Sequence, residues 1–155
     1  MSAGTFSKLY VQIVFATKGR TSSIALEWED ELYKYITGIV KNKGHKLIAI
    51  NGMPDHIHIL INFKPMCCLS DLVREIKKAS TSFINGNKWL KTKFSWQSGY
   101  GAFTYSEREI DSIIRYIQNQ KTHHGSSNFK EEYTELLSEF DIKYESRFLF
   151  KFIDE

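Results

Sequence analysis

Two short apolar segments joined by a tight turn constrain this fold more than any other feature of the chain. Leu47–Asn51 and His56–Phe63 are rich in β-branched residues, which favours strands, and the segment from Gly52 to Asp55 has turn composition. Strands joined this closely must pair antiparallel, because a parallel pair needs a crossover of about a dozen residues or more. The sequence therefore predicts a β-hairpin.

Further strands and helices surround the predicted hairpin. Leu9–Thr17 is β-branched and aromatic and predicts a strand, and Phe94–Tyr105 predicts another strand with an irregular centre. Apolar residues at helical spacing predict helices over Glu27–Lys43, Ser70–Gly86, Ser106–Lys121 and Asn128–Phe140, and Arg147–Ile153 is a final strand or packed coil. Together with the hairpin, this order favours an α+β fold, an antiparallel sheet with helices packed on one face, over a doubly wound parallel sheet.

Composition places the chain among ordinary globular domains. Its 155 residues suit a single domain, and 42% hydrophobic and 14% aromatic residues exclude a disordered chain. No segment approaches the roughly 18 apolar residues of a membrane-spanning helix. The N-terminus has no apolar signal core, so we expect a cytoplasmic protein without a membrane partner. The adjacent Cys67 and Cys68 are expected to be buried free thiols.

Charge is distributed unevenly along the chain. Residues 1–130 carry 18 basic and 10 acidic side chains, whereas residues 131–155 carry 3 and 8. One segment concentrates the basic residues: Arg74, Lys77, Lys78, Lys88, Lys91 and Lys93. A basic body with an acidic tail is compatible with a nucleic-acid partner, but charge alone favours a solvated helix face.

A His-Ile-His triplet is the first candidate for chemistry. Side chains alternate along a strand, so His56 and His58 share one face while Ile57 points to the other. Two imidazoles at this spacing can hold one divalent cation. The alternative is a pair of half-exposed strand histidines without a ligand.

Tyr116 and Gln120 form the second candidate. They lie four residues apart on the helix predicted over Ser106–Lys121, so their side chains share one face. A tyrosine oxygen can attack phosphorus, and an amide oxygen can bind a hard cation. The alternative is an amphipathic tyrosine beside a surface glutamine.

The order of these motifs resembles one protein family. The segments, in chain order, are LYVQIVFATKGR from Leu9, GMPDHIHILIN from Gly52, WQSGYGAF from Trp96 and YIQNQ from Tyr116. They are similar to the single-tyrosine HUH transposases of the IS200/IS605-like insertion sequences, where HUH means His-hydrophobe-His. The resemblance covers roughly residues 8–140 and implies one transposase domain over residues 1–155 with a ferredoxin-like or RRM-like HUH fold.

The resemblance also implies a reaction and the residues that perform it. His56, His58 and Gln120 would bind Mg²⁺ or Mn²⁺, and Tyr116 would attack a DNA phosphate to form a 5′-phosphotyrosine bond. The expected partner is single-stranded DNA with hairpin ends. Members of the family are homodimers in which the tyrosine helix of one subunit can complete the histidine site of the other.

This reaction suggests roles for further residues. Arg74, Lys77, Lys78, Lys88, Lys91 and Lys93 would bind phosphates, and Trp96 and other aromatic residues would stack on bases or pack in the core. Asp55 either orients His56 or is a turn residue. The roles of Gln12, His123 and His124 stay open, and many relatives have histidine where this chain has Gln12.

Two alternative functions are compatible with the same sequence. One keeps the chemistry, as a rolling-circle replication initiator or a domesticated relative of the transposases. The other is a non-catalytic module that binds single-stranded nucleic acid, since an antiparallel sheet with aromatic residues suits that role.

Overall fold

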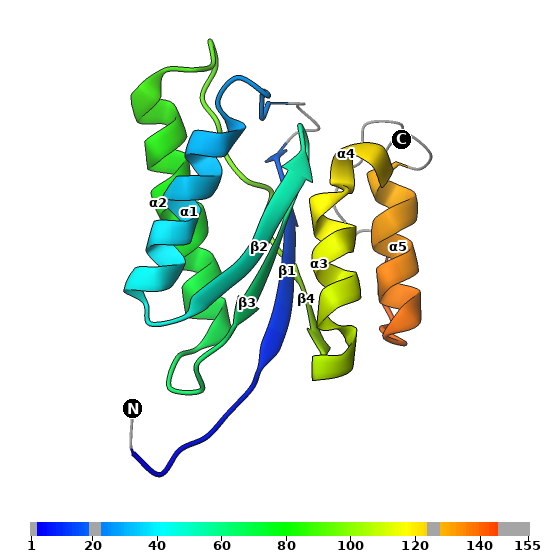
Figure 1. Ribbon diagram of the computed structural model, residues 1–155. Coiled ribbons are helices and arrows are strands. Elements are labelled where there is room, and N and C mark those ends of the chain that lie inside the picture. Colours follow the sequence, from blue (N-terminus) through cyan, green and yellow to red (C-terminus); the bar gives the residue numbers. More distant parts are fainter. Residues whose placement is uncertain (1–2, 19–22, 124–127, 146–155) are drawn as a thin grey trace.

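A four-stranded antiparallel sheet forms the centre of the molecule, with strand order β2-β3-β1-β4. The computed structural model describes residues 3–18, 23–123 and 128–145 (Figure 1). The elements in chain order are β1 (Tyr10–Ala16), α1 (Glu29–Asn42), β2 (Lys46–Met53), β3 (His56–Asn62), α2 (Leu69–Asn87), β4 (Gly101–Tyr105), the 3-10 turn η2 (Glu107–Glu109), α3 (Ile110–Gln118), α4 (Gln120–His123) and α5 (Phe129–Glu139). The predicted α+β class and the antiparallel hairpin of β2 and β3 are confirmed.

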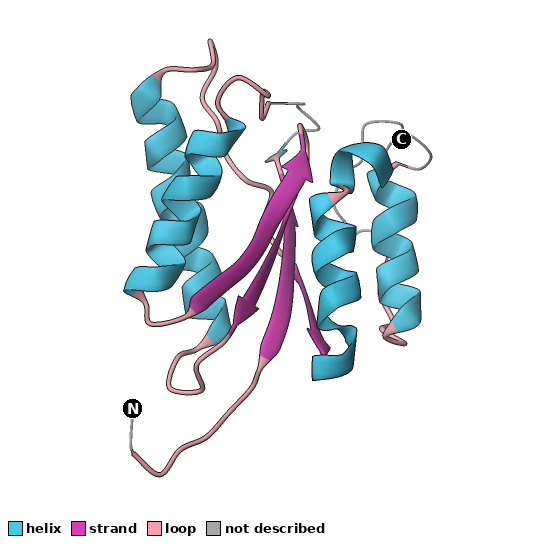
Figure 2. Ribbon diagram, viewed as in Figure 1, coloured by secondary structure: helices cyan, strands magenta, loops and turns pink. Residues whose placement is uncertain are grey.

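Helices cover both faces of the sheet, so the expectation that they pack on one face was wrong. α1 and α2 lie on one side of the strands, and α3, α4 and α5 lie on the other (Figure 2). The reason is visible in β3, which is buried at every position except its last. Ile57 and Ile59 belong to the large core cluster, and Leu60, on the opposite face, packs in a second cluster with Ile110 and Ile117 of α3. A strand with two buried faces needs a layer on each side.

Two predicted elements differ in their extent. The strand expected over Phe94–Tyr105 is regular only from Gly101, because Gly99 has a positive φ of 90° and only Trp96 forms an isolated bridge, with Thr17. The helix expected over Ser106–Lys121 begins with a 3-10 turn and breaks at Asn119 into α3 and α4. The side chain of Asn51 on β2 donates to the Gln118 carbonyl at this break.

The helix caps predicted from the sequence before α3 and α5 are present in the structure. Ser106 and Glu109 form a reciprocal capping box before α3, and the Asn128 side chain accepts from the Glu131 amide before α5. α5 rests on the sheet where β4 has Gly101: a Cβ at that position would lie 2.7 Å from the Tyr133 hydroxyl. The glycine therefore lets α5 approach the strand closely.

Three remaining expectations concern the ends and the surface of the molecule. The predicted segment Arg147–Ile153 lies outside the described residues. Among the described helices, none has the length and apolar composition of a membrane span. Both cysteines are free, but Cys67 is half-buried and Cys68 is exposed, because they lie in the turn before α2 rather than in the core.

Candidate active site

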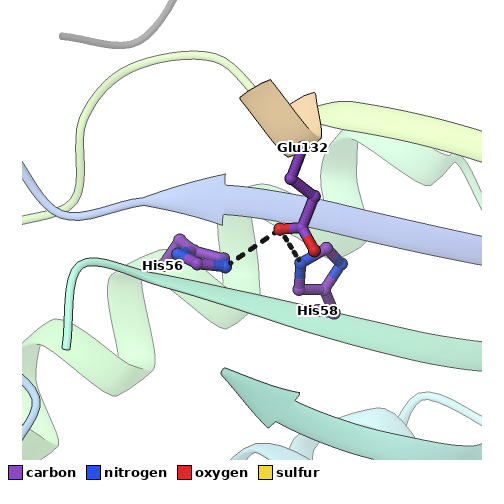
Figure 3. Close-up of side chains that lie close together, drawn as sticks. All are labelled: His56, His58 and Glu132. Carbon is purple, nitrogen blue, oxygen red and sulfur yellow. Dashed lines mark hydrogen bonds and ion pairs between the residues drawn. The ribbon is translucent and has the colours of Figure 1, made fainter. Parts of the chain in front are cut away.

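His56 and His58 stand side by side on the sheet face that α3 and α5 cover (Figure 3). Both side chains are fully buried, with 0% exposure, so they are not the half-exposed strand histidines of the alternative interpretation. Phe129 of α5 stacks on the His56 ring at 3.9 Å between centroids, and Tyr116 of α3 meets the His58 ring edge-on. The second helical layer therefore closes over the histidine pair.

Each imidazole is oriented through its Nδ1 atom. Asp55 Oδ1 lies 2.8 Å from His56 Nδ1, and Gln12 Oε1 lies 2.7 Å from His58 Nδ1. The Gln12 amide is itself fixed, because its Nε2 donates to the Tyr105 hydroxyl at 2.6 Å and its oxygen must then face His58. With Nδ1–H donated to these acceptors, both Nε2 atoms face the enclosed site. Such outer contacts fix the tautomer of metal-binding histidines.

Glu132 on α5 is the residue that the sequence analysis missed. Its Oε1 lies 3.3 Å from His56 Nε2 and 3.1 Å from His58 Nε2, and the side chain is 2% exposed. The sequence did carry a signal. Glu132 follows Phe129 by three residues and precedes Leu136 by four, so it belongs to the buried stripe of α5. An acidic residue on such a stripe indicates a buried partner or a ligand.

Tyr116 and Gln120 complete the cluster. The Tyr116 hydroxyl and Gln120 Nε2 both donate to Glu132 Oε2, the latter at 3.0 Å. Gln120 Oε1 lies 3.2 Å from His56 Nε2. The four residues selected from sequence therefore meet at one point, and a carboxylate lies between them.

The enclosed carboxylate controls the electrostatics of its neighbours. Burial lowers the pKa of His56, but hydrogen bonds to Asp55 and Glu132 outweigh burial and raise it above its ordinary value. Burial, reinforced by the charge of Glu132 and the hydrogen bond to it, raises the pKa of Tyr116 far above its usual range. Glu132 therefore favours the protonated form of both neighbouring side chains.

The donor set fits a divalent cation. One ligand atom each from His56, His58 and Glu132 lies within 4.8 Å of the others, and the Gln120 oxygen borders the same space. Imidazole nitrogen with carboxylate and amide oxygen is a borderline-to-hard set suited to first-row divalent ions and Mg²⁺. No thiolate belongs to the described cluster, so it is unlike a closed structural zinc site.

The basic residues selected from sequence divide into two groups. Arg74, Lys77, Lys78 and Trp96, together with Lys18, line a groove of about 710 Å³ between α2 and the segment before β4. The remaining residues, Lys88, Lys91 and Lys93, are exposed on the segment after α2 and do not line it.

Two groove residues are also engaged within the protein. Trp96 is 7% exposed; its ring packs edge-on against Phe15 and Phe94, and its Nε1 donates to Ser80, which favours core packing over base stacking. Lys77 Nζ donates to the carbonyl oxygens of Gln97 and Gly99. Burial lowers the pKa of Lys77 to about 8.

His123 ends α4, and His124 lies outside the described residues, so neither is assigned a role.

Comparison with known proteins identifies the family. The family described as "Transposase IS200 like" matches residues 5–120 of this chain. This segment contains the histidine pair, Tyr116 and Gln120. The chain belongs to the IS200-like transposase family. It is accordingly a tyrosine transposase of the HUH type, and the resemblance drawn from sequence is confirmed. Transposases of this type use a divalent cation, in agreement with the donor set.

Individual relatives support the IS200-like assignment. The ISDra2 transposase TnpA of Deinococcus radiodurans is 28% identical over 122 residues, covering 76% of this chain and 87% of its own. A solved structure of a putative transposase from Deinococcus radiodurans R1 is 30% identical, with a TM-score of 0.63 over 77% of this chain and 96% of its own. A REP-associated tyrosine transposase bound to a REP hairpin shares the fold, with a TM-score of 0.59 at 19% identity over 81% and 75% of the two chains.

Proposed function

We propose that this transposase nicks and rejoins single-stranded DNA through a covalent bond to Tyr116. The observation that carries the proposal is the meeting of a tyrosine hydroxyl with two imidazoles, a carboxylate and an amide in one buried cluster. A nucleophile adjacent to a metal site is the arrangement that phosphoryl transfer requires, because catalysis there consists of positioning and charge neutralisation.

Each residue has a role in the proposed step. His56, His58 and Gln120 hold the cation, Mg²⁺ or Mn²⁺, with Asp55 and Gln12 orienting the two imidazoles. When bound, the cation polarises the scissile phosphate and offsets the charge that develops on its oxygens. The Tyr116 oxygen loses its proton and forms a bond to phosphorus, the bond from phosphorus to the 3′ oxygen breaks, and that oxygen takes up a proton and leaves as a 3′-hydroxyl. Attack by another 3′-hydroxyl reverses the step, so joining needs no external energy source.

The proposed substrate is single-stranded DNA with hairpin ends. The groove lined by Lys18, Arg74, Lys77 and Lys78 offers positive charge at the surface, and phosphate contacts of this kind dominate affinity for nucleic acid. A protein with the same fold, the REP-associated tyrosine transposase, is bound to a REP hairpin. We further propose a cytoplasmic homodimer built from one transposase domain over residues 1–155.

The test is cleavage of matched DNA substrates in Mn²⁺. Wild-type protein is expected to cut a single strand carrying a hairpin and to leave a fully paired duplex of the same sequence intact. His56→Ala and His58→Ala are expected to abolish cleavage and to retain DNA binding, because the pair serves the reaction more than the affinity. Equal cleavage of both substrates, or normal cleavage by the double histidine variant, would overturn the proposal.

A further inference from the structure

We propose that Glu132 is an additional protein ligand of the cation and that its second oxygen holds Tyr116 and Gln120 in place. This inference rests on the proposed function and extends its ligand set. Glu132 lies beyond the segment, residues 5–120, that matches the family, so the match does not assign it a role. The inference comes from the position of one carboxylate among four side chains.

The two carboxylate oxygens face different partners. Oε1 lies within 3.3 Å of the Nε2 atoms of both histidines, which are the two atoms directed into the site. Oε2 accepts from the Tyr116 hydroxyl and from Gln120 Nε2. One oxygen is therefore placed among the metal donors, and the other fixes the nucleophile beside them.

Burying the carboxylate of Glu132 costs folding free energy unless the carboxylate has a charged partner. It lies on the buried stripe of α5 between Phe129 and Leu136, and its side chain is 2% exposed. An isolated buried carboxylate costs several kcal/mol or more, so such groups are paired or bind cations. Oε1 lies beside the Nε2 atoms of His56 and His58, which are metal donors. A divalent cation held by these three atoms supplies the charged partner that the buried carboxylate needs.

Glu132 also determines which atom of Gln120 faces the cation. A carboxylate oxygen only accepts hydrogen bonds, so the Gln120 amide must present its NH₂ group to Oε2. The amide oxygen then points toward His56 Nε2, at 3.2 Å. Gln120 is thus a ligand whose orientation depends on Glu132.

The charge of Glu132 changes what the site can bind. Two neutral imidazoles and an amide carry no net charge, whereas adding a carboxylate gives the set one negative charge. Affinity for hard divalent cations rises with the number of charged oxygen ligands. We therefore expect Glu132 to account for a large share of the affinity for Mn²⁺ and Mg²⁺.

The experiment measures Mn²⁺ affinity by titration calorimetry and by the paramagnetic resonance signal of free Mn²⁺. Glu132→Gln is compared with wild type, with His58→Ala and with Glu135→Gln, which removes the same charge from an exposed position on the same helix. Glu132→Gln is expected to weaken Mn²⁺ binding by about tenfold or more, and Glu135→Gln is expected to leave it unchanged. Thermal unfolding of the metal-free proteins checks that the variants fold, and Glu132→Asp is expected to restore part of the affinity.

The positioning of Tyr116 by Glu132 is tested by the kinetics of DNA cleavage. In saturating Mn²⁺, Glu132→Gln is expected to lower kcat for DNA cleavage while KM for DNA stays unchanged, because it disturbs the nucleophile and not the basic groove. The outcomes separate the two proposals. Folded Glu132→Gln with wild-type Mn²⁺ affinity would overturn this inference and leave the proposed function standing. Wild-type protein that neither binds Mn²⁺ nor cleaves single-stranded DNA would overturn the proposed function itself.

Discussion

At the scale of single residues, the two histidines are oriented by side chains on the side away from Glu132. Asp55 and Gln12 each bind the outer nitrogen of one histidine, and Tyr105 in turn fixes Gln12. Although β1 has Gln12 where many relatives have histidine, the amide oxygen of Gln12 still orients His58. This observation gives Gln12 and Asp55 structural roles that sequence left open.

Removing one orienting contact is expected to weaken the metal site without dismantling the fold. Asp55→Ala removes the carboxylate that contacts His56 Nδ1, so we expect Mn²⁺ affinity to fall by about ten- to a hundredfold. Calorimetric titration measures this, with the exposed Asp71→Ala as a matched control that keeps wild-type affinity. An Asp55→Ala protein with wild-type affinity would show that the contact is incidental.

Lys77 is expected to make DNA affinity depend on pH. Its pKa of about 8 lies below the ordinary value of 10.5, so the folded protein loses this charge as pH rises through 8. Between pH 7 and pH 9 we expect binding of single-stranded DNA to weaken. The slope of log affinity against log salt is expected to become shallower by about 0.7 for each phosphate that Lys77 no longer neutralises.

Lys77→Arg provides the control, because a guanidinium stays charged throughout this range. The variant is expected to show a smaller change in affinity between the two pH values. Equal pH dependence in both proteins would exclude Lys77 from the phosphate contacts.

At the scale of elements, the site is assembled by the docking of the second helical layer. Lys121 of α4 donates to Asn51 Oδ1 and to the Gly52 carbonyl and forms an ion pair with Glu29 of α1. Asn51 in turn donates to Gln118 at the end of α3. These contacts fix the α3–α4 junction, and with it Tyr116 and Gln120, at the end of the hairpin.

The seating of α5 on β4 can be tested at Gly101. Gly101→Ala would place a methyl group 2.7 Å from the Tyr133 hydroxyl and 3.0 Å from the Phe103 ring. Overpacking of this kind lowers the free energy of unfolding by about 1–3 kcal/mol, and it displaces Tyr133, which is next to Glu132 on α5. We therefore expect both a lower melting temperature and weaker Mn²⁺ binding.

Gly86→Ala is the matched control, because a Cβ there has no atom within 4 Å and alanine is the better helix former. We expect this variant to be as stable as wild type or slightly more stable, with unchanged Mn²⁺ affinity. A Gly101→Ala protein that behaves the same way would show that α5 does not depend on this close approach.

The sequence predicted most elements and four site residues, and its failures have physical causes. Periodicity identifies a helix but not the face of the sheet it covers, so the second layer was missed. The break at Asn119 depends on Asn51, which is remote in sequence, and no local pattern marks it. Glu132 was overlooked because Glu131, its neighbour, already explained the helix cap.

At the scale of the whole molecule, the fold brings His56, Tyr116, Gln120 and Glu132 together within one chain. We therefore predict that each subunit forms its own site. A mixture of Tyr116→Phe and His56→Ala chains should therefore stay inactive in single-strand cleavage, because neither chain holds a complete site. Recovered cleavage in the mixture would show that two subunits share the site, as the family resemblance implied.

The central claim is that Tyr116 becomes covalently bonded to DNA, and mapping the adduct tests it most directly. After incubation with a single-stranded hairpin and Mn²⁺, nuclease and protease digestion followed by mass spectrometry is predicted to find a nucleotide on the peptide containing Tyr116. Tyr116→Phe keeps the ring beside His58 and should fold and bind Mn²⁺, yet give no adduct. A nucleotide on Tyr105 or Tyr133, or an adduct formed by Tyr116→Phe, would contradict the account.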